Sequence, residues 1–196
     1  MRVGVLALQG DFREHINALA HCKVNAIEVR RVSELQSIDA LVIPGGESTS
    51  IVSLSKSFGL FEPIKKRIAE SMPTYGSCAG MIMLADHILA AKEGQETFGG
   101  LDITVRRNAF GRQVDSFECD ISAPAISSSP IRGIFIRAPW VEKVGKGVEV
   151  LATLEGPDKG SHPVAVRQGH LLATAFHPEI SDDYSVHRYF LEEVCK

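Results

Sequence analysis

The sequence predicts an α/β fold, with a mainly parallel central sheet, helices on both faces of that sheet, and extra strands in the C-terminal half. Three observations predict this class. Short apolar runs alternate with helical patterns up to about residue 99, the loops between them are short, and the rest of the chain is rich in strand-like runs separated by glycine, proline and serine. Sheets of this kind bind ligands at the carboxyl ends of their strands.

The first half of the chain shows repeated strand, loop and helix units. Residues 3–8 form an almost entirely apolar run, which is typical of a strand buried on both faces. Asp11 and Glu14 then have the spacing of a capping box at the start of a helix. Further strands are expected at residues 26–29 and 40–43.

More helices are expected before residue 90. Ser48 is a candidate N-cap of a helix that runs through Leu54, and Pro63 suits the first turn of another helix. Residues 81–85 are apolar and follow a glycine-rich turn, so we expect a buried helix there.

The second half is expected to be rich in strands and to end in one helix. That helix should begin at a cap, Ser181 or Asp182, and run to about Cys195. Since the chain has no internal repeat, low-complexity tract or linker, residues 1–196 are expected to form a single domain. The expected strands of this half are residues 101–105, 116–121, 133–136, 148–152, 164–166 and 171–175.

Composition argues against several classes of protein. The chain has a formal net charge of -3 and an isoelectric point near 6.2, whereas nucleic-acid-binding domains are usually basic, so no nucleic-acid partner is expected. No run of about 18 apolar residues predicts a membrane span, and the N-terminal apolar run is too short for a signal peptide. We therefore expect a cytoplasmic protein with no membrane partner. The four cysteines lie far apart, which supports free thiols and no metal site.

The first motif with chemical meaning surrounds Cys78. Residues 76–80 read Gly-Ser-Cys-Ala-Gly at a predicted junction between a strand and a helix, which is the pattern of a nucleophile elbow. The glycines allow a tight turn that lifts the sulfur above the sheet edge, and the helix N-terminus favours the thiolate, the form that attacks. The alternative is a turn of small residues around a buried structural cysteine.

A cysteine nucleophile needs a base and a group that orients the base. Among seven histidines, His177 stands out because it ends a predicted strand and precedes Pro178 and Glu179. In an extended segment, alternate residues point to the same side, so His177 and Glu179 can converge. The alternative is an ordinary turn at the strand end. The other histidines are expected to have no chemical role: His15, His21, His87 and His187 lie on predicted helices without a nearby acid, and His162 and His170 lie near turns.

A glycine turn at Gly45 and Gly46 also follows a predicted strand. Glycines there let backbone N–H groups point at a developing oxyanion. The alternatives are a phosphate-binding loop or merely a tight one. The Gly-Lys-Ser/Thr ending of a P-loop is missing, and no Gly-x-Gly-x-x-Gly motif occurs, so nucleotide binding is disfavoured.

In this order, the glycine turn, the Gly-x-Cys-x-Gly elbow and the His-Pro-Glu sequence resemble a class I (triad) glutamine amidotransferase, which implies a flavodoxin-like fold. Further segments resemble one family within that class, the glutaminase subunits of pyridoxal 5'-phosphate synthase. The segments that carry the resemblance are residues 6–10, 13–15, 44–49, 78–80, 107–118 (RNAFGRQVDSFE), 135–139 (FIRAP) and 176–179.

The resemblance implies a mechanism and a set of site residues. Cys78 would attack the side-chain amide of L-glutamine, His177 would protonate the departing ammonia and then activate water, and Glu179 would orient His177. No metal or organic cofactor is implied. Backbone at Gly46 and Ala79 would form the oxyanion hole, and the glutamine pocket would be lined by Gly46, Glu47, Ser48, Arg107, Ile136 and Arg137. Arg106, beside this pocket, stands where many relatives would be expected to have an acidic residue.

The resemblance also implies a partner, the synthase subunit that receives ammonia inside the complex and builds pyridoxal 5'-phosphate. Docking has a physical reason, because ammonia released into the cytoplasm would be protonated and lose its nucleophilicity. A further hypothesis is that the turn at Gly45 and Gly46 adopts its oxyanion-binding form only in that complex. The competing interpretations are a free-standing cysteine hydrolase, an amidotransferase subunit for another synthase, and a non-catalytic doubly wound binding module.

Overall fold

The computed structural model describes residues 1–89, 94–110 and 116–196. Its main sheet has the strand order β10-β11-β12-β4-β3-β1-β2. Strands β2, β1, β3, β4 and β12 run parallel to one another, whereas β11 and β10 continue the sheet in antiparallel fashion. The expected α/β class with a mainly parallel sheet is confirmed. Its strands are β1 (Val3–Leu6), β2 (Ile27–Val29), β3 (Ala40–Ile43), β4 (Thr74–Ser77), β10 (Glu149–Glu155), β11 (Ser161–Gln168) and β12 (Leu171–Thr174).

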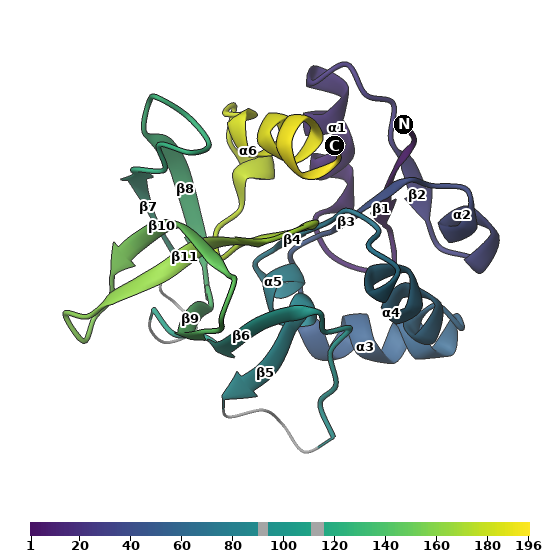
Figure 1. The fold of residues 1–196 in the computed structure, drawn as a ribbon, viewed down its shortest axis with the longest axis horizontal. Helices are drawn as coiled ribbons and strands as arrows, with labels where there is room; N and C mark the ends of the chain where they lie inside the picture. The colour runs from purple at the N-terminus through teal and green to yellow at the C-terminus, as the bar shows by residue number, and fades with distance from the viewer. Residues whose placement is uncertain (90–93, 111–115) are drawn as a thin grey trace.

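Helices cover both faces of this sheet (Figure 1). Helices α1 and α6 lie on one face, and α3, α4 and α5 lie on the other. Because both faces are covered, every residue of β1, β3, β4 and β12 is buried, which explains the nearly continuous apolar sequences of β1, β3 and β12. The helices are α1 (Phe12–His21), α2 (Val32–Gln36), α3 (Ser48–Ser57), α4 (Phe61–Ala69), α5 (Ala79–Leu84) and α6 (Ser185–Tyr189), which continues into a π-helical turn, η2 (Phe190–Val194).

Two smaller sheets form beside the main one. Strand β6 (Leu101–Arg106) lies between β5 (Ala85–Leu89) and β9 (Trp140–Val144), and β7 (Ser116–Ile121) pairs with β8 (Ile131–Ile136). Neither β5 nor β9 was expected from the sequence. Each pairs only with β6 in its sheet and carries exposed polar residues, so its apolar pattern is too short to predict a strand.

Several predicted helix caps are wrong. Asp11 precedes α1 but makes no side-chain cap hydrogen bond, so the expected capping box with Glu14 does not form. The cap of α3 is Glu47, whose side chain accepts a hydrogen bond from the backbone N–H of Ser50, and Ser48 is the first helical residue. The last helix begins at Ser185 rather than near Ser181, because Pro178–Ile180 forms a separate 3-10 turn, η1.

One segment that resembles the family is described only in part. Residues 111–115 of the segment 107–118 lie outside the described residues.

Within the three described ranges, no helix has both the length and the apolar character needed to cross a membrane.

Candidate active site

The carboxyl ends of neighbouring parallel strands bring the predicted site residues to one edge of the main sheet. Strands β4 and β12 pair in register, and the backbone N–H of Cys78, just after β4, donates to the carbonyl of Thr174 at 2.8 Å. The turns after β1 and β3 also meet, since the N–H of Asp11 donates to the carbonyl of Gly45 at 3.3 Å. Residues far apart in sequence therefore share one location.

Cys78 occupies a tight turn between β4 and α5. Its backbone has φ 47° and ψ -100°, a conformation that side-chain-bearing residues rarely adopt and that is concentrated at functional sites. The flanking glycines are required by close packing. A Cβ at Gly76 would collide with the backbone of Gly80, and a Cβ at Gly80 would collide with the carbonyl oxygen of Ile43 in β3.

Replacing Gly80 with alanine is expected to lower the free energy of unfolding by about 1–3 kcal/mol, because the backbone of β3 cannot move away without disturbing the sheet. Urea unfolding measures this effect. Gly59→Ala is the control: φ there is +68°, but a Cβ would meet nothing within 4 Å, so only a backbone penalty of about 1 kcal/mol applies. Equal stability of G80A and the wild type would contradict the packing argument.

The thiol of Cys78 and the imidazole of His177 are neighbours. Both residues are buried, and interaction with the Cys78 side chain is one of the causes that raise the pKa of His177. The Cys78 sulfur also lies 3.9 Å from the carbonyl oxygen of Ile136 in β8. The same strand also positions the backbone of His177, because the backbone N–H of His177 donates to the carbonyl of Ile134 at 2.9 Å.

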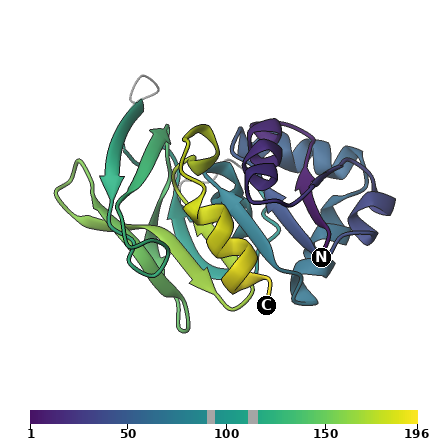
Figure 2. The same cartoon turned by 90° about the horizontal axis from the view of Figure 1, so that it is seen from above.

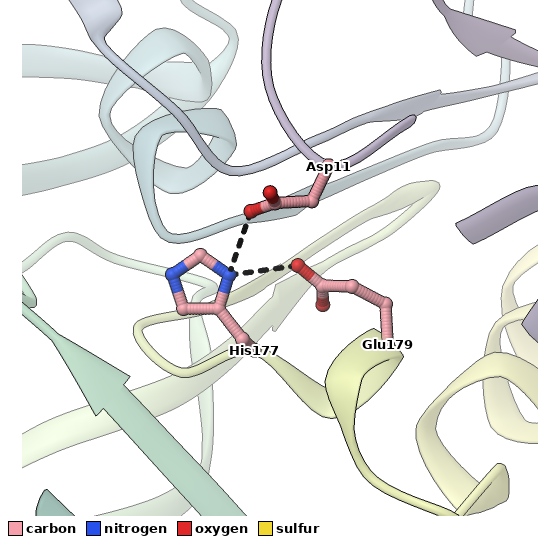
Figure 3. A group of neighbouring side chains, drawn as sticks. All are labelled: Asp11, His177 and Glu179. Carbon is pink, nitrogen blue, oxygen red and sulfur yellow. Dashed lines mark hydrogen bonds and ion pairs between the residues drawn. The ribbon is translucent and has the colours of Figure 1, made fainter. Parts of the chain in front are cut away.

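Two carboxylates face Nδ1 of His177 (Figure 3). Glu179 Oε1 lies 2.8 Å from this nitrogen and Asp11 Oδ2 lies 3.4 Å from it. Burial lowers the pKa of His177, but hydrogen bonds with Asp11, Cys78 and Glu179 outweigh burial and raise it to about 12. The two carboxylates therefore keep a proton on Nδ1 and stabilise the positively charged imidazolium.

The reason given for the approach of His177 to Glu179 is wrong. The predicted geometry was an extended segment, whereas Pro178–Ile180 forms the 3-10 turn η1, and this turn brings Glu179 back toward the imidazole. Asp11 was missed altogether because its position before α1 favoured a helix cap. No local sequence signal distinguishes an aspartate that caps a helix from one whose side chain contacts a residue after a different strand.

Glu179 also faces a group of buried polar residues. Its Oε1 lies 3.4 Å from Ser77 Oγ and 3.5 Å from His15 Nε2. His15 in turn lies 2.9 Å from Ser77 Oγ and, through Nδ1, 3.0 Å from Nε2 of His187. The expectation that His15 has no nearby acid is wrong, because the acid comes from η1, a distant part of the chain.

The charge of Glu179 is stabilised by these neighbours. Burial raises its pKa, but the interactions with His15 and His177 outweigh burial and lower the pKa below the usual range of a glutamate. Glu179 therefore stays ionised at neutral pH, as an acceptor for the proton on His177 must.

Burial of His187 is expected to make protein stability depend on pH. Burial, with a smaller effect of His15, lowers the pKa of His187 to about 3, against an opposing attraction from Glu179. The unfolded chain, with a pKa of about 6.5, binds a proton that the folded state excludes. Above about pH 6.5, His187 therefore does not lower the free energy of unfolding. As the pH falls from there toward 3, the free energy of unfolding decreases by up to about 1.4 kcal/mol per pH unit.

Urea unfolding between about pH 7.5 and 5 tests this prediction. His187→Gln keeps an amide donor for His15 but cannot titrate, so its stability should fall less steeply with pH than that of the wild type. His21→Gln, at an exposed position on α1, should follow the wild type. Parallel curves for H187Q and the wild type would contradict the prediction.

The turn after β3 places Gly46 next to Gln9. Gly46 has φ +148°, which favours glycine, and the backbone N–H of Glu47 donates to Gln9 Oε1 at 2.9 Å. Burial raises the pKa of Glu47, but hydrogen bonds from Thr49 and Ser50 lower it to about 2. The Glu47 carboxylate is thus ionised while it caps α3.

Glu47, Ser48 and Arg107 come together in one polar cluster. Arg107 Nη2 lies 3.3 Å from Glu47 Oε1, and Arg107 Nη1 donates to Gln95 Oε1 at 2.7 Å. Gln95, which was not predicted as a site residue, also donates to Ser48 Oγ at 3.1 Å. These bonds orient the Arg107 guanidinium, whose side chain is 16% exposed.

The remaining predicted residues lie apart from this cluster. Ile136 contributes its carbonyl oxygen beside the Cys78 sulfur. Arg137 is exposed, has φ 47°, and forms no hydrogen bond or ion pair with the part of the chain that the structure describes. Arg106 pairs with Glu142 of β9 at 2.9 Å, so a local partner balances its charge.

Asp11, His177 and Glu179 present ligand atoms within 4.8 Å of one another, a spacing that could also suit a metal ion. The geometry favours a shared proton. The distance of 2.8 Å between His177 Nδ1 and Glu179 Oε1 is that of a hydrogen bond, whereas two ligands of a tetrahedral zinc ion lie about 3.3 Å apart.

Known proteins resemble this chain over nearly its whole length. The model of the SNO glutamine amidotransferase family matches residues 5–196. The pyridoxal 5'-phosphate synthase subunit PdxT of Acidothermus cellulolyticus is 58% identical over 194 residues, covering 99% of this chain and 94% of the relative. The subunit of the same name from Salinispora tropica is 59% identical over 193 residues, covering 98% and 96%.

Solved structures agree in fold. A crystal structure of a glutamine amidotransferase is 48% identical, covers 97% of both chains and superposes with a TM-score of 0.88. PurLQS from Thermotoga maritima, 15% identical and covering 97% of both chains, has a TM-score of 0.72, which shows a shared fold only.

Proposed function

The chain belongs to the SNO glutamine amidotransferase family, and from this membership we propose that it hydrolyses the side-chain amide of L-glutamine to glutamate and ammonia for a synthase that makes pyridoxal 5'-phosphate. The observation that carries the proposal is the placement of Cys78, His177 and Glu179 together at the carboxyl edge of the sheet. The relatives named as synthase subunits support the choice of partner.

The proposed reaction proceeds in two steps. The sulfur of Cys78 attacks the amide carbon, and His177, which holds the proton removed from the thiol, donates it to the departing ammonia as the C–N bond breaks. The resulting thioester is then attacked by water. His177 accepts a proton from this water and returns it to the sulfur as the C–S bond breaks and glutamate forms.

Glu179 keeps its charge next to Nδ1 throughout. Its carboxylate accepts the Nδ1 hydrogen, leaves Nε2 free to exchange protons with sulfur, ammonia and water, and stabilises the imidazolium. The positive charge that develops on His177 is thus balanced inside a buried site.

Backbone N–H groups at Gly46 and Ala79 are proposed to stabilise the oxyanion that forms when sulfur attacks. Ala79 is the first residue of α5, whose N-terminal N–H groups have no acceptor within the helix. Gly46 belongs to a turn already in contact with Gln9 and Asp11 through its neighbours. We propose that docking of the synthase completes the oxyanion-binding form of this turn.

The glutamine pocket is proposed to comprise Gly46, Glu47, Ser48, Arg107, Ile136 and Arg137. A guanidinium and an ionised carboxylate suit the two ends of a zwitterionic amino acid. Arg107 is held by Glu47 and Gln95, whereas Arg137 is free to turn toward a substrate. The proposal also includes action as one domain over residues 1–196, in the cytoplasm, where the synthase would use the ammonia.

Glutamate release tests the proposal directly. Purified protein is incubated with L-glutamine with and without a candidate pyridoxal 5'-phosphate synthase subunit, and glutamate is measured. We expect release that rises when the synthase is added. Equal release in both samples would point to a free-standing hydrolase, and no release in either would contradict the proposal.

Alkylation separates a catalytic thiol from a structural one. Diazo-oxo-norleucine imitates glutamine and carries an electrophilic carbon, so mass spectrometry should find it on Cys78 and not on the other cysteines. Failure to label Cys78 while general alkylating agents react elsewhere would favour a non-catalytic binding module.

A further inference from the structure

A chain of buried polar side chains continues from Glu179 into the interior. Ser77 Oγ lies 3.4 Å from Glu179 Oε1, His15 Nε2 lies 2.9 Å from Ser77 Oγ, and His187 Nε2 lies 3.0 Å from His15 Nδ1. All three of these residues are fully buried. The proposed chemistry uses none of them directly.

The direction of the hydrogen bonds follows from His187, the last residue of this series of polar side chains. Nδ1 of His187 is buried and has no hydrogen-bond partner within the described residues. A buried N–H without an acceptor costs more than an unused acceptor, so the hydrogen of His187 belongs on Nε2. His187 then donates to His15 Nδ1, His15 donates from Nε2 to Ser77, and the Ser77 hydroxyl donates to Glu179.

Packing holds these side chains in place. The ring of Tyr75 meets both imidazoles edge to face, with centroid distances of 5.8 Å to His15 and 5.9 Å to His187. The Tyr75 hydroxyl is bonded to Thr174 Oγ1 at 2.9 Å, which fixes the ring. The chain links α1, β4 and α6, and Figure 2 shows α1 and α6 on the same side of the sheet.

Glu179 depends on these bonds because only one of its oxygens is held. Oε2 is buried without a partner in the described residues, while Oε1 accepts hydrogen bonds from His177 and Ser77 and lies 3.5 Å from His15 Nε2. Without the interior donors, the carboxylate could rotate about its terminal bond and leave His177 without a fixed acceptor.

We propose that His187, His15 and Ser77 are positioning residues, forming a one-directional hydrogen-bond chain that fixes the carboxylate of Glu179 and so orients His177. This inference rests on the proposed glutaminase function. It adds residues from two helices outside the strand-end site to the groups that determine the rate.

Nuclear magnetic resonance tests the hydrogen positions without any assay of activity. Long-range proton–nitrogen spectra of protein labelled with nitrogen-15 in histidine report the tautomer of each ring, and H15Q and H187Q identify the signals. We expect both His15 and His187 to carry the ring hydrogen on Nε2 rather than on Nδ1. Hydrogen on Nδ1 of His15 would reverse the chain and overturn the proposal.

Kinetics with the synthase complex test the positioning role. His15→Leu removes the donor to Ser77, and we expect kcat to fall by about 10-fold or more while KM changes less than about threefold, since ground-state contacts with glutamine are intact. His15→Gln places an amide donor near the Nε2 position and should restore kcat to within about threefold of the wild type.

The double variant and a surface variant provide controls. Ser77→Ala breaks the next link, so the H15L/S77A variant should be no slower than the slower single variant within about twofold, because both act through one chain. His21→Leu, on the exposed side of the same helix, should keep wild-type kcat. Thermal unfolding of each variant separates loss of folded protein from loss of rate.

The outcomes are distinct. H15L that is less stable but has unchanged kcat per folded molecule would assign the chain a structural role only and overturn the proposal. Failure of the wild-type complex to release glutamate would instead contradict the proposed function, and the tautomer measurement would still decide the direction of the chain.

Discussion

Replacement of Cys78 with alanine should reduce glutamate release by the synthase complex at least about 10³-fold, because the variant cannot form the thioester and the remaining groups act on water alone. The fold should be retained, since alanine fits the buried space of the cysteine. Glutamate is measured at saturating glutamine, and circular dichroism and thermal unfolding check the fold.

A matched variant makes this result specific. Cys119→Ala removes a half-buried thiol in β7, a strand that contributes no proposed site residue, and should leave release unchanged. A folded C78A protein that still produced glutamate at the wild-type rate would eliminate Cys78 as the nucleophile and with it the proposed mechanism.

Replacement of Glu179 with glutamine should lower kcat by about 10²–10⁴-fold, because a neutral amide stabilises the imidazolium poorly and no longer fixes the tautomer of His177. The hydrogen-bond donors around Glu179 should make the loss of kcat larger. The new NH₂ group would have to coexist with two hydrogens that now point at Oε1, from His177 and Ser77. KM for glutamine should change little.

Steady-state kinetics of E179Q with the synthase measure both constants. Glu118→Gln, an exposed change in β7 that removes an ion pair with Arg132, is the control and should keep wild-type kcat. A kcat within about threefold of the wild type for E179Q would mean that Asp11, at 3.4 Å, suffices to orient His177.

Much of the fold was predictable because its signals are local. Uninterrupted apolar runs identified β1, β3 and β12, since strands covered on both faces have no polar side to display. Strands β5 and β9 were missed because their exposed faces carry charged residues that resemble loops. The caps at Asp11 and Ser48 were wrong because short polar residues before a helix serve many purposes.

Some residues of the candidate site were likewise predictable from local sequence, and others were not. Residues of the elbow and the His-Pro-Glu sequence were predicted from motifs whose spacing reflects backbone requirements, such as the collisions that exclude side chains at Gly76 and Gly80. Asp11, Gln95, His15 and His187 carry no such spacing. Their partners lie on other elements, and only the packing of α1 and α6 over the sheet brings them together.

The sequence by itself therefore determined the class of fold, the family and the sulfur, imidazole and carboxylate proposed to perform the chemistry, because periodicity and motif spacing are written along the chain. Tertiary structure alone decided which oxygen each imidazole nitrogen faces and which buried groups surround Glu179. The physical reason is that hydrogen bonds depend on distances of about 3 Å between atoms, and contacts between residues as distant in the chain as His15 and His187 exist only once the helices have packed.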